Sequence, residues 1–113
     1  MKRFLLTAFF FTFAWICMNA QIKNAKTEEV KINGVCEMCK ATIEKAGNLS
    51  NEANVVWDVD SKTAKITYDA KKTSLNTVLK RIAKAGYDSE KVKASDEAYQ
   101  KLPACCQYER KTN

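Results

Sequence analysis

The stretch that decides the fold is residues 28–47, which read EEVKINGVCEMCKATIEKAG. Its first part alternates between apolar and polar side chains, with Val30 and Ile32 on one side, as expected of a half-buried strand that Gly34 ends. Residues 40–47 are predicted to be helical, because their apolar positions lie at helical spacing (i, i+4, i+7) from the second cysteine. These positions are Cys39, Ile43 and Ala46. The sequence therefore predicts a strand, a loop that carries two cysteines, and a helix that follows this loop.

Two strands, a second helix and a last short strand are predicted downstream of this unit. The two strands alternate in the same way over 54–60 and 63–69. The helix begins at Ser74 and closes at Gly86, and its apolar positions are Leu75, Val78, Leu79, Ile82 and Ala83. The last strand is expected over 89–94. This β-α-β-β-α-β order predicts an α+β fold, a ferredoxin-like sandwich in which two helices cover one antiparallel sheet.

The beginning of the chain is typical of a secretory signal peptide. Residues 1–20 contain Lys2 and Arg3, then an apolar run, then Ala20, after which we expect cleavage. The run is shorter than the roughly 20 apolar residues that a membrane span needs. We therefore expect a periplasmic or otherwise secreted protein that has no membrane association once the signal is removed.

The rest of the chain divides into three parts. A polar stretch without periodicity, residues 21–27, is expected to be a flexible leader. The predicted sandwich covers residues 28–94, and a short tail covers residues 95–113. Within the tail, residues 95–102 are expected to form two helical turns that Pro103 ends. Tyr99 and Leu102 would give those turns a small apolar face for docking onto the domain.

The composition excludes several classes of function. The chain has no His, so it cannot form a Ser-His-Asp triad, a Cys-His nucleophile or an imidazole metal site. The net charge is +6, and without the signal 17 basic residues stand against 13 acidic ones, which leaves +4 and no cluster of Arg. Nucleic acid is therefore not an expected partner, and we do not expect an enzyme.

Five cysteines in 113 residues are the main chemical feature of the sequence. Cys17 lies in the predicted signal peptide, Cys36 and Cys39 lie in the first loop, and Cys105 and Cys106 lie in the tail. Two thiols at a Cys-x-x-Cys spacing can point at one ion, and the positive end of a helix dipole favours their thiolate form. Thiolates without imidazole or carboxylate form a soft site, which selects Cu(I), Hg(II) and, with further thiolates, Zn(II) or Cd(II).

The loop GVCEMC (34–39) and the helix KATIEKA (40–46) resemble the heavy-metal-associated domain family, and Ala85-Gly86-Tyr87 matches that family as well. The family includes copper chaperones, metal-binding domains of copper-transporting ATPases and the periplasmic mercury-binding protein. The resemblance covers about residues 28–94. It implies the fold given above, Cys36 and Cys39 as ligands of Cu(I) or another soft ion, and an aromatic Tyr87 near the metal loop.

The loop departs from the family at one place. The family usually has a buried Met two residues before the first ligand, whereas this chain has Gly34 there and carries Met38 between its cysteines. We expect Met38 to serve in packing rather than as a ligand, because a methionine beside a core usually does so.

The tail cysteines have three interpretations. The tail could fold back and add thiolates to the loop site, the pair could hold a separate soft ion or exchange disulfides, or it could form a structural disulfide. Exposed thiols in an oxidising compartment oxidise or exchange. We therefore predict that Cys105 and Cys106 lie near Cys36 and Cys39, and that at least one of them adds a sulfur to the bound ion.

The function expected from these features is that of an exported soft-metal carrier or scavenger, with Cu(I) as its ion. Transfer would proceed by thiolate exchange with a metal-donor or metal-acceptor protein that has thiolates of its own, and the carrier would be a monomer or a metal-bridged dimer. Two alternatives remain open at this point. One is a thiol-disulfide oxidoreductase, because Cys-x-x-Cys after a strand is also the thioredoxin arrangement. The other is a binding module whose cysteines form only structural disulfides.

Overall fold

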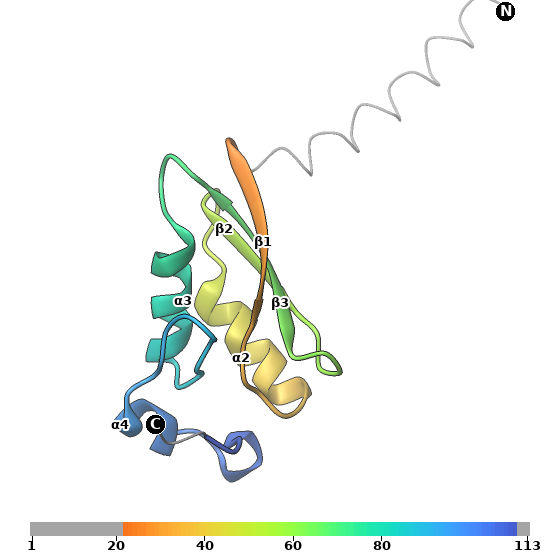
Figure 1. Cartoon of the computed structure of the whole chain (residues 1–113), viewed down its shortest axis with the longest axis vertical. Helices are drawn as coiled ribbons and strands as arrows, with labels where there is room; N and C mark the ends of the chain where they lie inside the picture. Colours follow the sequence, from red (N-terminus) through yellow and green to blue (C-terminus); the bar gives the residue numbers. More distant parts are fainter. Residues whose placement is uncertain (1–21, 111–113) are drawn as a thin grey trace, which may run out of the picture.

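Three antiparallel strands form a sheet in the order β1-β3-β2 (Figure 1). The computed structural model describes residues 22–110. Along the chain its elements are β1 (Ala25–Lys31), α2 (Glu37–Gly47), β2 (Ala53–Trp57), β3 (Thr63–Asp69), α3 (Leu75–Lys84), α4 (Asp96–Gln100) and a short 3-10 turn (Ala104–Cys106). The predicted α+β, ferredoxin-like fold class is confirmed.

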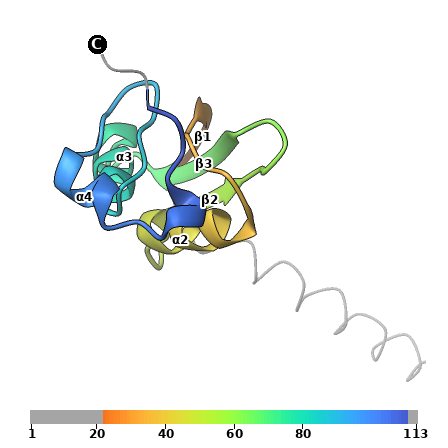
Figure 2. The same cartoon turned by 90° about the horizontal axis from the view of Figure 1, so that it is seen from below.

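Both long helices lie on one face of the sheet, and the core fills the space between the two layers (Figures 1 and 2). The alternation of the strands explains this arrangement, because Val55 and Trp57 of β2 are buried whereas Val56 between them is exposed. The helices contribute their apolar stripes, and the fully buried side chains include Ile43, Val78, Leu79 and Ile82. The sandwich thus buries one face of the sheet, as the sequence pattern predicts.

The second long helix has the boundaries that the sequence indicates. The Ser74 hydroxyl caps α3 by accepting a hydrogen bond from the Thr77 N–H at 3.2 Å. After the helix, Gly86 adopts a positive φ of 109°, a conformation that L-residues rarely adopt. The first helix begins earlier than residue 40, because α2 starts at Glu37 and has Cys36 as its N-cap residue. Both loop cysteines therefore lie in or next to the first helical turn.

Two boundaries of the sheet differ from the prediction. β1 begins at Ala25 rather than residue 28, because Ala25, Lys26 and Thr27 pair with β3 although they are exposed. The prediction of a flexible leader over 21–27 was therefore wrong for residues 25–27, which belong to β1. β2 ends at Trp57 rather than residue 60, because the Asp58 carboxylate accepts the Ser61 N–H at 2.8 Å and starts the turn.

The predicted last strand over 89–94 is reduced to a single bridge between Ile32 and Ser89. Side-chain oxygens accept hydrogen bonds from backbone N–H groups that would otherwise pair with a neighbouring strand. The Ser89 hydroxyl accepts the Val92 N–H at 2.9 Å, and the Asp88 carboxylate accepts the Ala94 N–H at 2.6 Å. The described part of the sheet consequently has three strands.

The tail begins with the predicted helix, α4, whose N-cap Ser95 accepts the Ala98 N–H at 3.1 Å. The helix ends at Gln100 with Lys101 as its C-cap residue, short of the predicted end at residue 102, and Pro103 instead precedes the 3-10 turn. Leu102 between them is buried. The predicted signal peptide, including Cys17, lies outside the described residues. Among the described residues no helix has the length and apolar character to cross a membrane.

Candidate metal centre

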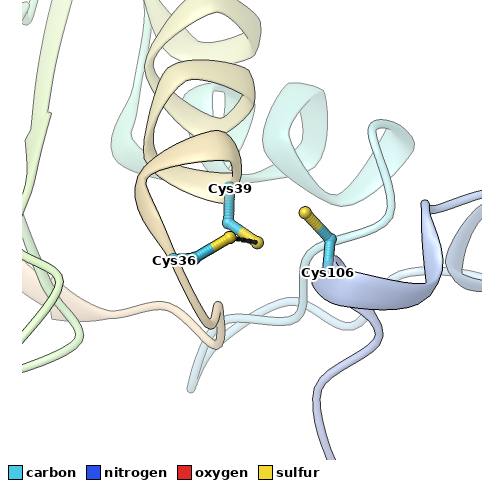
Figure 3. A group of neighbouring side chains, drawn as sticks. All are labelled: Cys36, Cys39 and Cys106. Carbon is cyan, nitrogen blue, oxygen red and sulfur yellow. Dashed lines mark hydrogen bonds between the residues drawn. The ribbon is translucent and has the colours of Figure 1, made fainter.

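The two loop cysteines lie at the N-terminus of α2 with their sulfur atoms 3.9 Å apart (Figure 3). Cys36 is the N-cap residue and is partly buried, whereas Cys39 in the first turn is fully buried. The loop comes directly from β1, and the N–H of Asn33 donates to the Asp88 carbonyl at 2.8 Å, which ties the loop to the end of the domain. The pair therefore occupies the position predicted from the sequence, with the positive end of the helix dipole beneath it.

Gly34 has a structural reason to replace the usual methionine. A Cβ atom at position 34 would lie only 2.8 Å from Cζ2 of Trp57, closer than real Cβ contacts allow. The indole ring of Trp57 is fully buried, and its N–H donates to the Ile32 carbonyl at 2.9 Å. The tryptophan thus fills the space beside the metal loop that a side chain at position 34 would need.

Cys106 joins the loop pair from the other end of the chain. Figure 3 shows its sulfur pointing from the tail toward Cys36 and Cys39. The three sulfur atoms all lie within 4.8 Å of one another, and Cys106 is fully buried. The prediction that the tail folds back onto the loop is therefore confirmed for this cysteine.

A set of hydrogen bonds holds the tail in this position. The Tyr108 hydroxyl accepts the N–H of Asp88 and donates to the carbonyl of Gly86, both at 2.8 Å. The Arg110 guanidinium binds the Asp88 carboxylate at two points, and it also forms a salt bridge with Asp96 at 2.8 Å. Because Asp88 also holds the cysteine loop through its carbonyl, one residue fixes both segments that supply sulfur.

Cys105 lies at the edge of this group rather than inside it. Its exposed sulfur is 4.0 Å from that of Cys106 and 3.7 Å from Sδ of Met38. The structure therefore brings three of the four predicted cysteines together, with the fourth on their outer side. All four are free thiols.

The surroundings of the sulfurs shift their proton affinities in opposite directions. Burial opposes ionisation of Cys39, but hydrogen bonds from Cys106 and the backbone outweigh it and lower the pKa of Cys39. Burial raises the pKa of Cys106 to about 12, and the neighbouring Cys39 adds to the rise. Of these two thiols, the one in the loop is therefore the more acidic.

Tyr87 lies where the family resemblance places an aromatic residue. Its side chain is 1% exposed and stacks on Tyr108, and burial together with the adjacent Cys106 and Cys39 raises the pKa of its hydroxyl. That hydroxyl has no hydrogen-bond partner of good geometry among the described residues. An orphaned donor beside two sulfurs can donate to a thiolate, so its position suits a site in which these sulfurs carry negative charge.

The three sulfurs lie close to the arrangement that one soft ion requires. With the zinc–thiolate bond length of about 2.3 Å as a guide, three sulfurs around one ion in a plane lie about 4.0 Å apart. The sulfurs of Cys36 and Cys39 are separated by nearly this distance, 3.9 Å. The sulfur of Cys106 lies within 4.8 Å of both. Because the donors are three thiols, the set favours Cu(I) and other soft ions over Mg²⁺, Ca²⁺ or Mn²⁺.

The fold and this cysteine site define a small domain of the soft-metal-binding class. The chain belongs to the heavy-metal-associated domain family, whose model matches residues 29–88. Among solved structures, one described as a CopZ metallochaperone has the same fold, with a TM-score of 0.53 and 23% sequence identity, over 57% of this chain and 98% of that chain. No curated protein matches the chain. The family prediction is confirmed, and Cys106 lies beyond the matched residues.

The residues that anchor the tail were not predicted from the sequence. Asp88, Tyr108 and Arg110 form contacts across about 20 residues, and no local period connects them. A weak signal existed in Tyr99 and Leu102, the apolar pair that was expected to dock the tail. Leu102 is buried, and Tyr99 packs edge-on against Tyr108.

Proposed function

We propose that this protein is an exported carrier or scavenger of a soft metal ion, Cu(I) in the first place, which it holds with the thiolates of Cys36, Cys39 and Cys106. The observation that carries the proposal is the gathering of these three sulfurs within 4.8 Å of one another. Two come from the first turn of α2 and one from the tail, so the fold builds the site from two segments that are far apart in the sequence. The ion is cargo, and the protein performs no reaction on it.

Release would proceed by thiolate exchange with a partner protein. Cys36 is the only partly exposed sulfur of the three, whereas Cys39 and Cys106 are buried. An incoming partner thiolate would therefore meet the ion on the side of Cys36 and displace that sulfur first. Three sulfurs hold an ion more securely than two, so the arrangement favours safe holding or scavenging over rapid shuttling.

Export is the second part of the proposal. The charged start, the apolar run and Ala20 support a signal peptide over residues 1–20. The mature chain would then comprise residues 21–113, which include every described element, and would act in the periplasm or outside the cell. Intact-mass analysis of cell-envelope material should find Gln21, or a residue close to it, as the first residue, and retention of residues 1–20 would contradict export.

X-ray absorption on the reduced mature chain, loaded with one equivalent of Cu(I), tests the site. We expect three sulfur ligands in the native protein and two in Cys106→Ser, whereas Cys36→Ser should lower the affinity by orders of magnitude in competition with a chelating probe. Ala104→Ser is the matched control, because it places the same hydroxyl at an exposed neighbouring position.

Two sulfurs in both the native protein and Cys106→Ser would remove the tail from the site. Native affinity in Cys36→Ser would reject the site altogether. Catalysis of disulfide reduction by the metal-free protein would instead favour the oxidoreductase alternative, with Cys36 and Cys39 as its reactive pair.

A further inference from the structure

A second group of sulfur atoms lies on the outer side of the three-thiol site. Met38 projects from the first turn of α2 and is 54% exposed, more than any other large apolar side chain among the described residues. The exposed thiol of Cys105 lies against it, with 3.7 Å between Sγ of Cys105 and Sδ of Met38. These residues are 67 positions apart in the sequence, so the docked tail creates their contact.

Cys106 connects this outer group to the buried site. Its sulfur is 4.0 Å from that of Cys105 and also belongs to the inner group with Cys36 and Cys39. With separations of 3.7 and 4.0 Å, the sulfurs in each pair are close enough to bind one ion together, because bonds of about 2.3 Å give about 4.0 Å between sulfurs in a plane. A thiolate has more than one lone pair, so the Cys106 sulfur can bind an ion on each side.

We propose that Cys105, Met38 and Cys106 form a second soft-metal site, which holds a second Cu(I) next to the first and shares the Cys106 thiolate with it. The proposal rests on the proposed function, because it requires Cys106 as an inner ligand. The Cys105 thiol releases its proton to solvent as the ion binds, and the neutral thioether of Met38 contributes a lone pair. Cysteine and methionine sulfur together select Cu(I).

The exposure of the outer group suggests what the second site does. Met38 and Cys105 face solvent, whereas Cys39 and Cys106 are buried. An ion captured at the surface therefore lies one shared sulfur away from the inner site, and the outer site is the place where Cu(I) enters. Met38 is then a ligand, contrary to the packing role expected from the sequence.

The stoichiometry of the reduced mature chain tests the second site. Native mass spectrometry with Cu(I) buffered by a competing chelator should show two ions in the native protein and one in Cys105→Ser or Met38→Leu. Leu has nearly the volume of Met, so the second variant removes the sulfur with little change in shape. Ala104→Ser, in the same turn, should still bind two ions.

Thiol labelling gives a second measurement that identifies the residue. After one equivalent of Cu(I), an alkylating reagent should still modify Cys105 but not the three inner cysteines. After two equivalents Cys105 should be protected as well, and Met38→Leu should abolish that second protection.

The outcomes separate the two proposals. A single ion in the native protein that is lost in Cys36→Ser, or two ions in Cys105→Ser and Met38→Leu, would overturn the outer site and leave the inner one. The contact between Cys105 and Met38 would then be a thiol–thioether hydrogen bond that packs the tail on α2. No Cu(I) bound at all would reject the proposed function itself.

Discussion

The guanidinium of Arg110 lies against the carboxylate of Asp88, with Nε 2.9 Å from Oδ2 and Nη2 3.0 Å from Oδ1. The Asp88 side chain is nearly buried, so loss of the arginine would leave a carboxylate without its charged partner. This pair fastens the end of the tail beside the same residue that holds the cysteine loop. It therefore controls how firmly Cys106 stays at the metal centre.

We predict that Arg110→Ala loosens the tail without unfolding the sandwich. Breaking a buried ion pair costs about 3 kcal/mol. If this cost lowers the free energy of opening the tail, Cys106 becomes exposed on the order of a hundredfold more often. The rate at which an alkylating reagent modifies Cys106 in the metal-free, reduced protein measures this opening. Lys101→Ala, which removes an exposed positive charge from the same tail, is the control and should leave the rate unchanged. Equal rates in native protein and Arg110→Ala would show that other contacts hold the tail.

The close approach of Gly34 and Trp57 gives a prediction about coupling. Gly34→Met forces a side chain into the indole ring and should destabilise the fold by about 1–3 kcal/mol, as overpacking does. Trp57→Val alone leaves a cavity and should cost about 3 kcal/mol or more. The destabilisation of the double variant should be about 1–3 kcal/mol smaller than the sum of the two single effects, because the methionine then occupies the space that Trp57 leaves. Chemical denaturation of the four proteins measures the difference, and strict additivity would show that the two positions do not compete for one space.

Gly86 joins the second long helix to the segment on which the tail docks, so its replacement should act on the tail. An added Cβ would lie 2.8 Å from the carbonyl oxygen of Ala98, and the φ of 109° is strained for alanine. We expect Gly86→Ala to lower the free energy of unfolding by roughly 2–3 kcal/mol and to increase alkylation of Cys106. Ser74→Ala, which removes only the cap of α3, should cost about 1 kcal/mol and leave that alkylation unchanged. The same alkylation rate in Gly86→Ala and Ser74→Ala would contradict a link between Gly86 and the tail.

The sandwich could be predicted from the sequence because its information is local. Alternation around Val55 and Ile66, the stripe of α3 and the Cys-x-x-Cys at a helix start each appear within a dozen residues. The edges were harder to predict. Ala25–Thr27 form a strand because β3 supplies backbone partners, and their side chains are exposed and carry no apolar pattern. At the opposite end of the same edge strand, where Ser89 bridges Ile32, Asp88 and Ser89 capture backbone N–H groups, so the segment after them does not continue as a strand.

The candidate site divides in the same way. Cys36 and Cys39 follow from spacing and from their place before a helix, whereas the position of Cys106 depends on where the tail docks. That position is determined by contacts such as the hydrogen bond between Tyr108 and Gly86. The two residues are 22 positions apart, and no sequence periodicity connects them. Chemical reasoning about exposed thiols predicted the direction in which the tail folds, but not that Cys106 is the inner cysteine and Cys105 the outer one.

Metal should fasten the tail to the domain, and limited proteolysis can detect this. Lys101 is exposed between α4 and the cysteine pair, and trypsin can cleave after it when the tail opens. An ion bound to Cys36, Cys39 and Cys106 bonds the tail to the loop, so the tail cannot open without breaking a metal–sulfur bond. The closed form therefore binds Cu(I) more tightly than the open form, in which only the loop holds the ion, and cleavage after Lys101 should slow when Cu(I) is added. In Cys106→Ser the same Cu(I) occupies the loop alone and should give no protection at Lys101, whereas Mg²⁺ should protect neither protein. Equal protection of the native protein and Cys106→Ser by Cu(I) would place the tail outside the metal centre.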